Sequence, residues 1–277
     1  RDFCLSRGLG DVYKRQEDNS SLEKALCEKY NLDVVKIAYA PLNTTNEIKK
    51  SISIKAADYL HEIAKDGDII GVCWGTTIYN MALNLKHKAL KGVQIVQLKG
   101  GISHSQSNTY AYEVVELFSE AFSTVGRYLP LPVMFDTAQI KELIERDKHI
   151  KKILDLGRQA NIAVFTVGTV KNDALLFRLG YIDKKDRDII QNRAVGDICS
   201  RFIDAQGNIC DKELDERTVG IKLEDLKEKE KRVLVAGSKR KISAIKATLV
   251  GEIANILITD QYTCLLYTSP SPRDRQK

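Results

Sequence analysis

Residues 66–82 read DGDIIGVCWGTTIYNMA, and this stretch decides the fold. A turn at Asp66–Asp68 leads into the apolar, β-branched run Ile69–Cys73, which predicts a buried strand. Gly75 then precedes an amphipathic segment, and we expect a helix over Thr76–Leu85. A buried strand that passes through a short glycine turn into a helix is typical of α/β proteins.

The same alternation continues on both sides of this stretch. It predicts an α/β protein with a mostly parallel sheet and helices on both faces. One domain is the simplest organisation, with a small subdomain around residues 130–160. Residues 197–204 are predicted to form one arm of a hairpin that ends in a turn at 205–208. The charged segment 224–232 is predicted to be a solvated loop or helix face. The other predicted strands are 34–40, 93–98, 162–167, 233–236 and 256–259, and the other helices are 46–64, 111–125, 147–159, 184–192 and 240–250.

The composition excludes several classes of protein. Of the 277 residues, 43% are hydrophobic, too many for an intrinsically disordered chain. No apolar run approaches the roughly 20 residues that a membrane helix needs. We therefore expect a globular cytoplasmic protein with no membrane contact.

The two ends differ from the rest of the chain. Residues 1–16 and 264–277 lack helical or strand periodicity, and the first lacks the apolar run of a targeting signal. We expect both to be non-native, adapter-derived segments and 17–263 to be the evolved domain. Each end carries a net charge of +2, so only +2 of the total +6 belongs to residues 17–263. That small charge argues against a nucleic-acid-binding surface.

Cysteine and glycine patterns exclude common cofactor sites. The four cysteines of residues 17–263 are Cys27, Cys73, Cys199 and Cys210, with no CxxC pair and no neighbouring histidine cluster. They predict reduced, mostly buried thiols rather than a metal site. The G-x-G-x-x-G turn of dinucleotide-binding proteins is absent. We expect neither a metal nor a cofactor.

The loops after the strands are the places to look for a ligand site. In an open parallel sheet, ligands bind beyond the carboxyl ends of the strands. The loops concerned follow strands that end near Cys73, Leu98, Val167 and Ala236.

The first of these loops can hold an anion. Gly75 lets a ligand approach the backbone, and Thr76 and Thr77 offer hydroxyl and N–H groups at a helix start, which predicts phosphate binding. An ordinary threonine N-cap explains the same residues equally well. The lysine and spacing of a Walker A loop are absent.

The second loop carries a candidate nucleophile. Lys99 stands at the carboxyl end of a central strand and is followed by Gly100 and Gly101. Desolvation there would lower the pKa of the amine and allow a Schiff base with an aldehyde. A lysine that pairs with a phosphate or extends to solvent is at least as plausible from the sequence.

A further glycine turn could add a second anion contact. Gly237, Ser238 and Lys241 follow another strand, although a basic solvated turn is the alternative. His104 and Asn108 lie after the Lys99 loop and could bind sugar hydroxyls. Two glycine turns and a strand-end lysine together predict a phosphorylated carbonyl ligand.

Several motifs resemble one known family. The chain is similar to the effector-binding domain of SorC-type transcriptional regulators over nearly all of residues 17–263. The resemblance implies a Rossmann-like fold of the NagB/RpiA/CoA-transferase type. The motifs that carry it are DGDIIGVCWGTTIYNMA, VQLKGGISHSQSNTY, RYLPLPVMFD, ANIAVFTVGTV, ALLFRLGY, AVGDICSRFIDAQGNIC and ANILITD.

The resemblance also implies a ligand and its contacts. It is nearest to repressors of deoxyribonucleoside catabolism that sense deoxyribose 5-phosphate, in which the lysine matching Lys99 forms a Schiff base with the sugar. Where the family usually has a second glycine, this chain has Ser238, which puts the backbone contact of that turn in doubt. The other positions that match are Thr76 and Thr77 in the phosphate turn, Lys241 after the second turn, and Asn108, Asp173 and Asp197 along the pocket.

Two classes of function follow from these residues. A regulatory domain would bind its effector and alter operator binding through a helix-turn-helix that precedes residue 17 in the family and is missing here. We expect such a regulator to be a homo-oligomer. The alternative is an enzyme on the same fold, an aldolase or a sugar-phosphate isomerase. His104 and Asp197 are its candidate proton shuttles, although nothing in their spacing requires that role.

Overall fold

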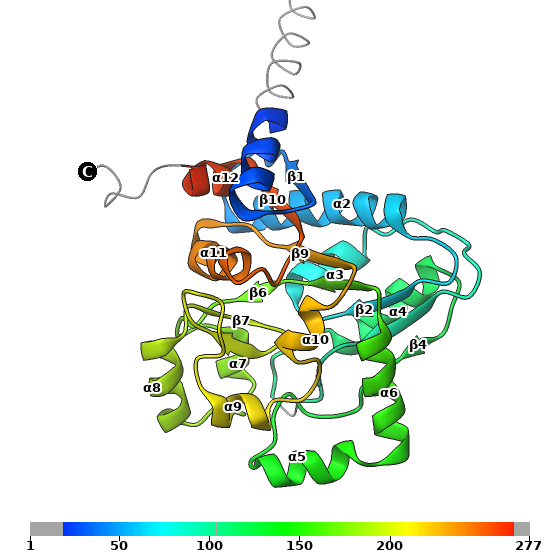
Figure 1. The fold of residues 1–277 in the computed structure, drawn as a ribbon, viewed down its shortest axis with the longest axis vertical. Coiled ribbons are helices and arrows are strands. Elements are labelled where there is room, and N and C mark those ends of the chain that lie inside the picture. The colour runs from blue at the N-terminus through cyan, green and yellow to red at the C-terminus, as the bar shows by residue number, and fades with distance from the viewer. Residues whose placement is uncertain (1–18, 104, 269–277) are drawn as a thin grey trace, which may run out of the picture.

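The computed structural model describes residues 19–103 and 105–268. A seven-stranded parallel sheet forms its centre, in the order β1-β10-β9-β5-β2-β3-β4 (Figure 1). The strands are β1 (Val34–Ala38), β10 (Ile256–Asp260), β9 (Lys231–Val235), β5 (Ile162–Phe165), β2 (Ile69–Val72), β3 (Gln94–Gln97) and β4 (Gly126–Arg127). The α/β fold with a mostly parallel sheet is confirmed.

Helices cover both faces of this sheet, as predicted. On one face, α2 (Thr45–Ile63), α3 (Thr76–Ala82) and α4 (Ala111–Ala121) bury a cluster that includes Ile70 and Val72. The other face is covered by a helix over residues 19–30 and by α6 (Lys148–Gln159), α10 (Leu223–Lys227), α11 (Ile242–Val250) and α12 (Gln261–Thr268). Successive strand residues point to opposite faces, so each strand contributes to both cores.

A small antiparallel sheet lies beside the carboxyl ends of the large one. It consists of β6 (Val167–Gly168), β7 (Gly196–Ile198) and β8 (Arg201–Ile203). Around it stand α7 (Leu175–Arg178), α8 (Lys184–Arg193) and α9 (Lys212–Arg217). Helix α5 (Ala138–Glu145) lies at the bottom of the view in Figure 1, and α6 rises at its lower right. The small sheet brings a second set of side chains to the strand ends.

Several predicted elements differ in extent. The strand over 162–167 is divided, because the chain leaves the large sheet after Phe165 and enters the small one. Residues 197–204 do not form one hairpin arm: they fold back on themselves through Cys199 and Ser200, whose φ angles are 50° and 70°. The segment 224–232 is also not wholly solvated, since Leu226 and Lys229 are buried.

The C-terminal end forms a helix where none was expected. Helix α12 runs from Gln261 to Thr268, and Cys264 on it is fully buried. Residues 1–18, 104 and 269–277 lie outside the described part of the chain, so the predictions for 1–16, for His104 and for most of 264–277 concern residues that the structure does not describe. In the described residues, no helix is long and apolar enough to cross a membrane.

Candidate functional site

A cavity of about 280 Å³ lies at the carboxyl ends of four adjacent strands. The loop after β3 contributes Lys99, and the turn from β2 into α3 contributes Trp74–Thr77. The segment after β5, which includes β6, contributes Thr166–Thr169. The loop after β9 contributes residues 237, 238, 240 and 241. This position is the one expected for a ligand in an open parallel sheet.

Lys99 is held from two sides. It lies two residues beyond β3, and its backbone pairs with Gly220 in an isolated antiparallel bridge. The side chain is only 5% exposed. Its Nζ donates a 3.2 Å hydrogen bond to Ser200 Oγ and stands 3.6 Å from the centre of the Trp74 ring. The hydroxyl and the electron-rich ring face together hold the amine in the cavity wall.

Lys241 approaches the same cavity from the β9 side. It ends the short 3-10 helix η1 (Lys239–Lys241), and its Nζ donates a 3.3 Å hydrogen bond to Thr166 Oγ1. Burial lowers the pKa of this amine to about 8, with the charges of Lys49 and Lys99 acting in the same direction and Asp197 opposing them. A fraction of Lys241 is therefore neutral at physiological pH.

Asp197 is a buried carboxylate that interacts electrostatically with both lysines. It comes from β7 of the small sheet, and its Oδ2 accepts a 3.2 Å hydrogen bond from the Ser200 backbone N–H. Burial raises the pKa of its carboxyl group, while Lys99, that hydrogen bond and Lys241 lower it. Gly168 on the neighbouring strand leaves space for the Asp197 side chain, because a Cβ at that position would overlap the carboxylate.

The loop after β2 supplies an open backbone turn. Gly75 is the N-cap of α3, with φ 135° and ψ 165° and no side-chain capping bond. Of the next two residues, Thr76 is exposed and Thr77 is buried, and both line the cavity. The predicted alternative of a threonine N-cap is wrong, because glycine occupies that position.

At the second glycine turn, the Ser238 backbone N–H is already bonded within the protein. Ser238 has φ 84°, and its N–H donates to Thr263 Oγ1 at 2.8 Å and to Asp260 Oδ2 at 3.4 Å. A Cβ on Gly237 would overlap the Asp260 carboxylate. Both residues line the cavity, but the Ser238 N–H points into the protein rather than toward a ligand. The Ser238 N–H is therefore not available to a ligand, whereas the Lys241 side chain of this turn lines the cavity.

Two predicted site residues do not line this cavity. Asn108 accepts a hydrogen bond from the Tyr110 N–H at 2.8 Å and donates one to Glu113, and it lines a separate cavity. Gly100 has a packing role instead: a Cβ there would overlap the carbonyl oxygen of Pro132, and its own oxygen accepts the Trp74 indole N–H at 2.8 Å.

Asp173 does lie at the cavity, but it is already paired. Its two carboxylate oxygens accept hydrogen bonds from Arg240 at 2.5 and 2.6 Å. Both bonds come from Arg240 Nη2, and they hold the pKa of the Asp173 carboxyl below its usual range. The pair is solvent-exposed and joins the loop before α7 to η1 across the cavity wall.

The sequence reasoning missed some of the lining residues. Thr45, Lys49 and Ile52 come from α2, which packs on α3, and no local motif marks them. Thr166–Thr169 surround the strand end near Val167, where a ligand was expected, but no ligand contact was assigned to these residues. Arg240 was part of the basic turn. Among the described residues, no cluster of three or more His, Cys, Asp or Glu side chains could hold a metal ion.

Comparison with known proteins places the chain among bacterial regulators. Residues 14–266 match the family described as "Putative sugar-binding domain". The deoxyribonucleoside regulator of Bacillus subtilis (strain 168) is 52% identical over 247 residues, which cover 89% of this chain and 79% of the relative.

Two solved structures share the fold. A transcriptional regulator from Streptococcus pneumoniae TIGR4 has a TM-score of 0.84 at 26% identity and covers 91% of this chain and 97% of its own. The full-length sorbitol operon regulator SorC from Klebsiella pneumoniae has a TM-score of 0.81 at 22% identity, with 92% and 82% covered, and shows the fold alone. These relatives are named as regulators rather than enzymes. The chain belongs to the sugar-binding domain family of SorC-type transcriptional regulators.

Proposed function

We propose that the chain is the effector-binding domain of a cytoplasmic repressor of deoxyribonucleoside catabolism. Its effector is deoxyribose 5-phosphate, which it holds through its phosphate and through a Schiff base on Lys99. The full-length protein binds operator DNA through a helix-turn-helix and acts as a homo-oligomer. The name of the Bacillus subtilis relative, deoxyribonucleoside regulator, supports the choice of pathway.

The charge of the cavity is the observation that carries this proposal. Its lining holds four basic side chains and two carboxylates, Asp173 and Asp197. The basic side chains are Lys49, Lys99, Arg240 and Lys241. The excess of two positive charges balances a phosphomonoester, which carries about −1.5 to −2 at pH 7. A neutral sugar would leave this excess positive charge of the cavity uncompensated.

The position of Lys99 supports the covalent step. In a Schiff base, the amine nitrogen attacks the aldehyde carbon, and water leaves as the C=N bond forms. Asp197 lies beside both lysines and can exchange a proton with the departing hydroxyl. A reversible imine selects open-chain aldehydes by reactivity as well as by shape, which suits a sensor. The phosphate then occupies the Lys241 and Gly75–Thr77 side of the cavity.

Borohydride trapping tests this proposal. Reduction in the presence of deoxyribose 5-phosphate should add the sugar phosphate to the peptide that contains Lys99. Lys99→Met should abolish the adduct, whereas Lys241→Met should retain it at saturating ligand. An adduct on Lys241, or an unmodified Lys99 in protein that binds the ligand, would contradict the assignment. Release of acetaldehyde and glyceraldehyde 3-phosphate would instead favour an aldolase.

A matched ligand separates the two kinds of contact. The sugar alcohol 2-deoxyribitol 5-phosphate keeps the phosphate and lacks the aldehyde. Wild-type protein should bind the aldehyde more tightly than the alcohol, and Lys99→Met should remove this preference while still binding both. Equal binding of the two ligands by the wild type would exclude an imine contribution to affinity.

A further inference from the structure

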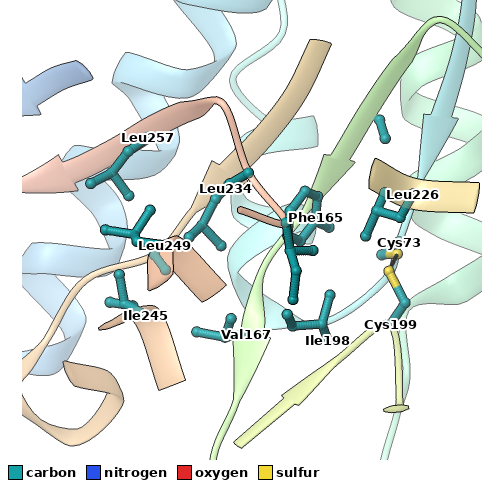
Figure 2. Close-up of a cluster of buried hydrophobic side chains, with 14 of the residues drawn as sticks. Cys73, Phe165, Val167, Ile198, Cys199, Leu226, Leu234, Ile245, Leu249 and Leu257 are labelled. Atoms are coloured by element: carbon teal, nitrogen blue, oxygen red, sulfur yellow. Dashed lines mark hydrogen bonds between the residues drawn. The ribbon is translucent and has the colours of Figure 1, made fainter. Parts of the chain in front are cut away.

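Two buried cysteines meet beside the candidate site. Cys73 follows β2 directly, and Cys199 lies in the turn between β7 and β8. Their Sγ atoms stand 2.6 Å apart, and the residues are only 1% and 2% exposed. Figure 2 shows the two sulfur atoms pointing toward each other from these two elements. A disulfide has about 2.05 Å between its sulfurs, so closing the bond needs a shift of about half an ångström.

Each cysteine is adjacent to a residue that holds Lys99. Cys73 precedes Trp74, whose ring lies under the Lys99 amine, and Cys199 precedes Ser200, which accepts the hydrogen bond from that amine. Asp197 lies two residues before Cys199, and its carboxylate accepts a hydrogen bond from the Ser200 N–H. A covalent link between the sulfurs would therefore connect the two sides of the lysine's resting position.

The turn that carries Cys199 has a demanding geometry. Cys199 and Ser200 both have positive φ, the arrangement of a two-residue hairpin turn that usually contains glycine or asparagine. Residues other than glycine, asparagine and aspartate rarely adopt this backbone conformation, so the surrounding contacts must hold the turn in place. The structure thus maintains at some cost the turn that presents one thiol to Cys73 and one hydroxyl to Lys99.

We propose that Cys73 and Cys199 form a reversible disulfide that makes the effector site sensitive to peroxide. Its effect on ligand binding rests on the proposed function, whereas formation of the bond does not. Among the described cysteines, Cys27 and Cys210 are half-buried, so surface exposure alone would favour oxidation of those residues first. The proposed selectivity comes from the distance between the two sulfurs.

The oxidation is balanced with hydrogen peroxide as the oxidant. One thiolate attacks a peroxide oxygen, the O–O bond breaks, and a sulfenic acid and hydroxide form. The second thiol then attacks the sulfenic sulfur, the S–S bond forms, and water leaves. Two thiols and one peroxide therefore give one disulfide and two waters, and a thiol reductant reverses the change. Burial raises the pKa of the Cys73 thiol, so we expect the reaction to accelerate with rising pH.

The link should weaken effector binding. An imine requires the Lys99 amine to leave Ser200 and the Trp74 ring and move to the aldehyde carbon. The disulfide fixes Trp74 and Ser200 relative to each other and so stabilises the arrangement that holds the amine in its resting position. We expect an affinity for deoxyribose 5-phosphate about 5-fold or more lower in the oxidised protein, the lower range of ordinary coupling between sites.

Peptide mapping under non-reducing conditions tests the bond. Peroxide-treated protein should yield a peptide pair that joins Cys73 to Cys199, lighter than the separate peptides by two hydrogens and separated again by reductant. Cys73→Ala and Cys199→Ala should each remove the linked pair, and Cys210→Ala should retain it. Thiols that stay unlinked, or that become sulfinic acids, would overturn the proposal.

Ligand titration tests the coupling. Binding of deoxyribose 5-phosphate is measured on reduced and oxidised wild type and on Cys199→Ala, which cannot form the bond. Peroxide should weaken binding by the wild type and leave binding by the variant unchanged. A linked protein with unaltered affinity would overturn the coupling. Failure of the reduced protein to bind the sugar would instead contradict the proposed function, and the peptide map would still decide the bond.

Discussion

The two glycine turns at the cavity resemble each other in sequence and differ in what they offer a ligand. At the turn after β2, Gly75 has φ 135°, and the nearest atom to an added Cβ would be a Thr166 methyl carbon at 3.9 Å. At the turn after β9, Gly237 is crowded by Asp260, and the Ser238 N–H is bonded to Thr263 and Asp260. The first turn can present its backbone to an anion, whereas the second contributes the Lys241 side chain.

This difference divides the phosphate contacts between backbone and side chain. A backbone N–H is fixed by the fold and keeps its charge distribution at every pH. A buried lysine depends on its protonation state, and Lys241 has a pKa of about 8. Changes at the two turns should therefore have different consequences for affinity, pH dependence and stability.

Replacement of Lys241 should have the largest effect. Lys241→Met replaces a charged hydrogen-bond donor with an uncharged side chain of similar shape. Hydrogen bonds to charged groups contribute about 1.5–3 kcal/mol, or about 10–150-fold in affinity. Calorimetric titration should show this loss equally for deoxyribose 5-phosphate and 2-deoxyribitol 5-phosphate. The melting temperature should not fall, since burial disfavours the charge that the variant removes. A loss confined to the aldehyde would mean that Lys241 acts on the carbonyl rather than on the phosphate.

Replacement of Gly75 should affect both stability and binding. Gly75→Ala places a side chain where φ is 135°, a region that costs about 1–3 kcal/mol for residues other than glycine. Denaturant unfolding should show that loss, and affinity for either ligand should fall because the turn is displaced. Gly157→Ala is the matched control: Gly157 lies within α6, where alanine favours the helix and its Cβ would meet Leu98 at 3.4 Å. Equal effects at the two glycines would argue against a special turn at Gly75.

Affinity should decrease with rising pH around 8. Because burial lowers the pKa of Lys241 in the unliganded protein, the amine is mostly charged at pH 7 and mostly neutral at pH 9. The phosphate is already a dianion over this range. If only the charged amine binds it, affinity falls about 10-fold between pH 7 and 9. Titrations at constant ionic strength should show this slope in the wild type, and Lys241→Met should flatten it.

The same pKa has a consequence for folding stability. The folded protein releases the Lys241 proton near pH 8, whereas the unfolded chain holds it until about pH 10.4. The unfolded state therefore binds more protons between these values, and this group's contribution to stability rises with pH across that window. Below pH 8 the unfavourable contribution of the buried charge is fully present.

Replacement of Ser238 should have the smallest effect. Ser238→Gly relieves a φ of 84° and loses a weak cap, the 3.4 Å bond from the Arg240 N–H to Ser238 Oγ. Relief of the strain outweighs the few tenths of a kcal/mol that such a cap contributes over glycine. We expect unfolding stability to rise by about 1 kcal/mol and phosphate affinity to stay the same. A large gain in affinity would show that a glycine here restores a backbone contact.

Much of the fold follows from local patterns. Short β-branched runs that alternate with amphipathic segments predict buried strands and helices, and these were confirmed within a few residues at most ends. The β7–β8 turn was missed because Cys199 and Ser200 carry no glycine or asparagine signal. The division of 162–167 was missed because a continuous apolar run has the same sequence pattern whether it forms one strand or contributes to two different sheets.

The sequence by itself determined that Lys99, Gly75 and Lys241 follow strands, and that the carboxyl ends of parallel strands share one edge. That is enough to predict a ligand cavity there. Only the tertiary structure decided which side chains complete it: Lys49 arrives from α2 and Asp197 from the small sheet, and Asn108 points elsewhere. The contact between Cys73 and Cys199, which are 126 residues apart in sequence, could likewise not be predicted from the sequence. Such contacts depend on how separate elements pack, and no local spacing encodes them.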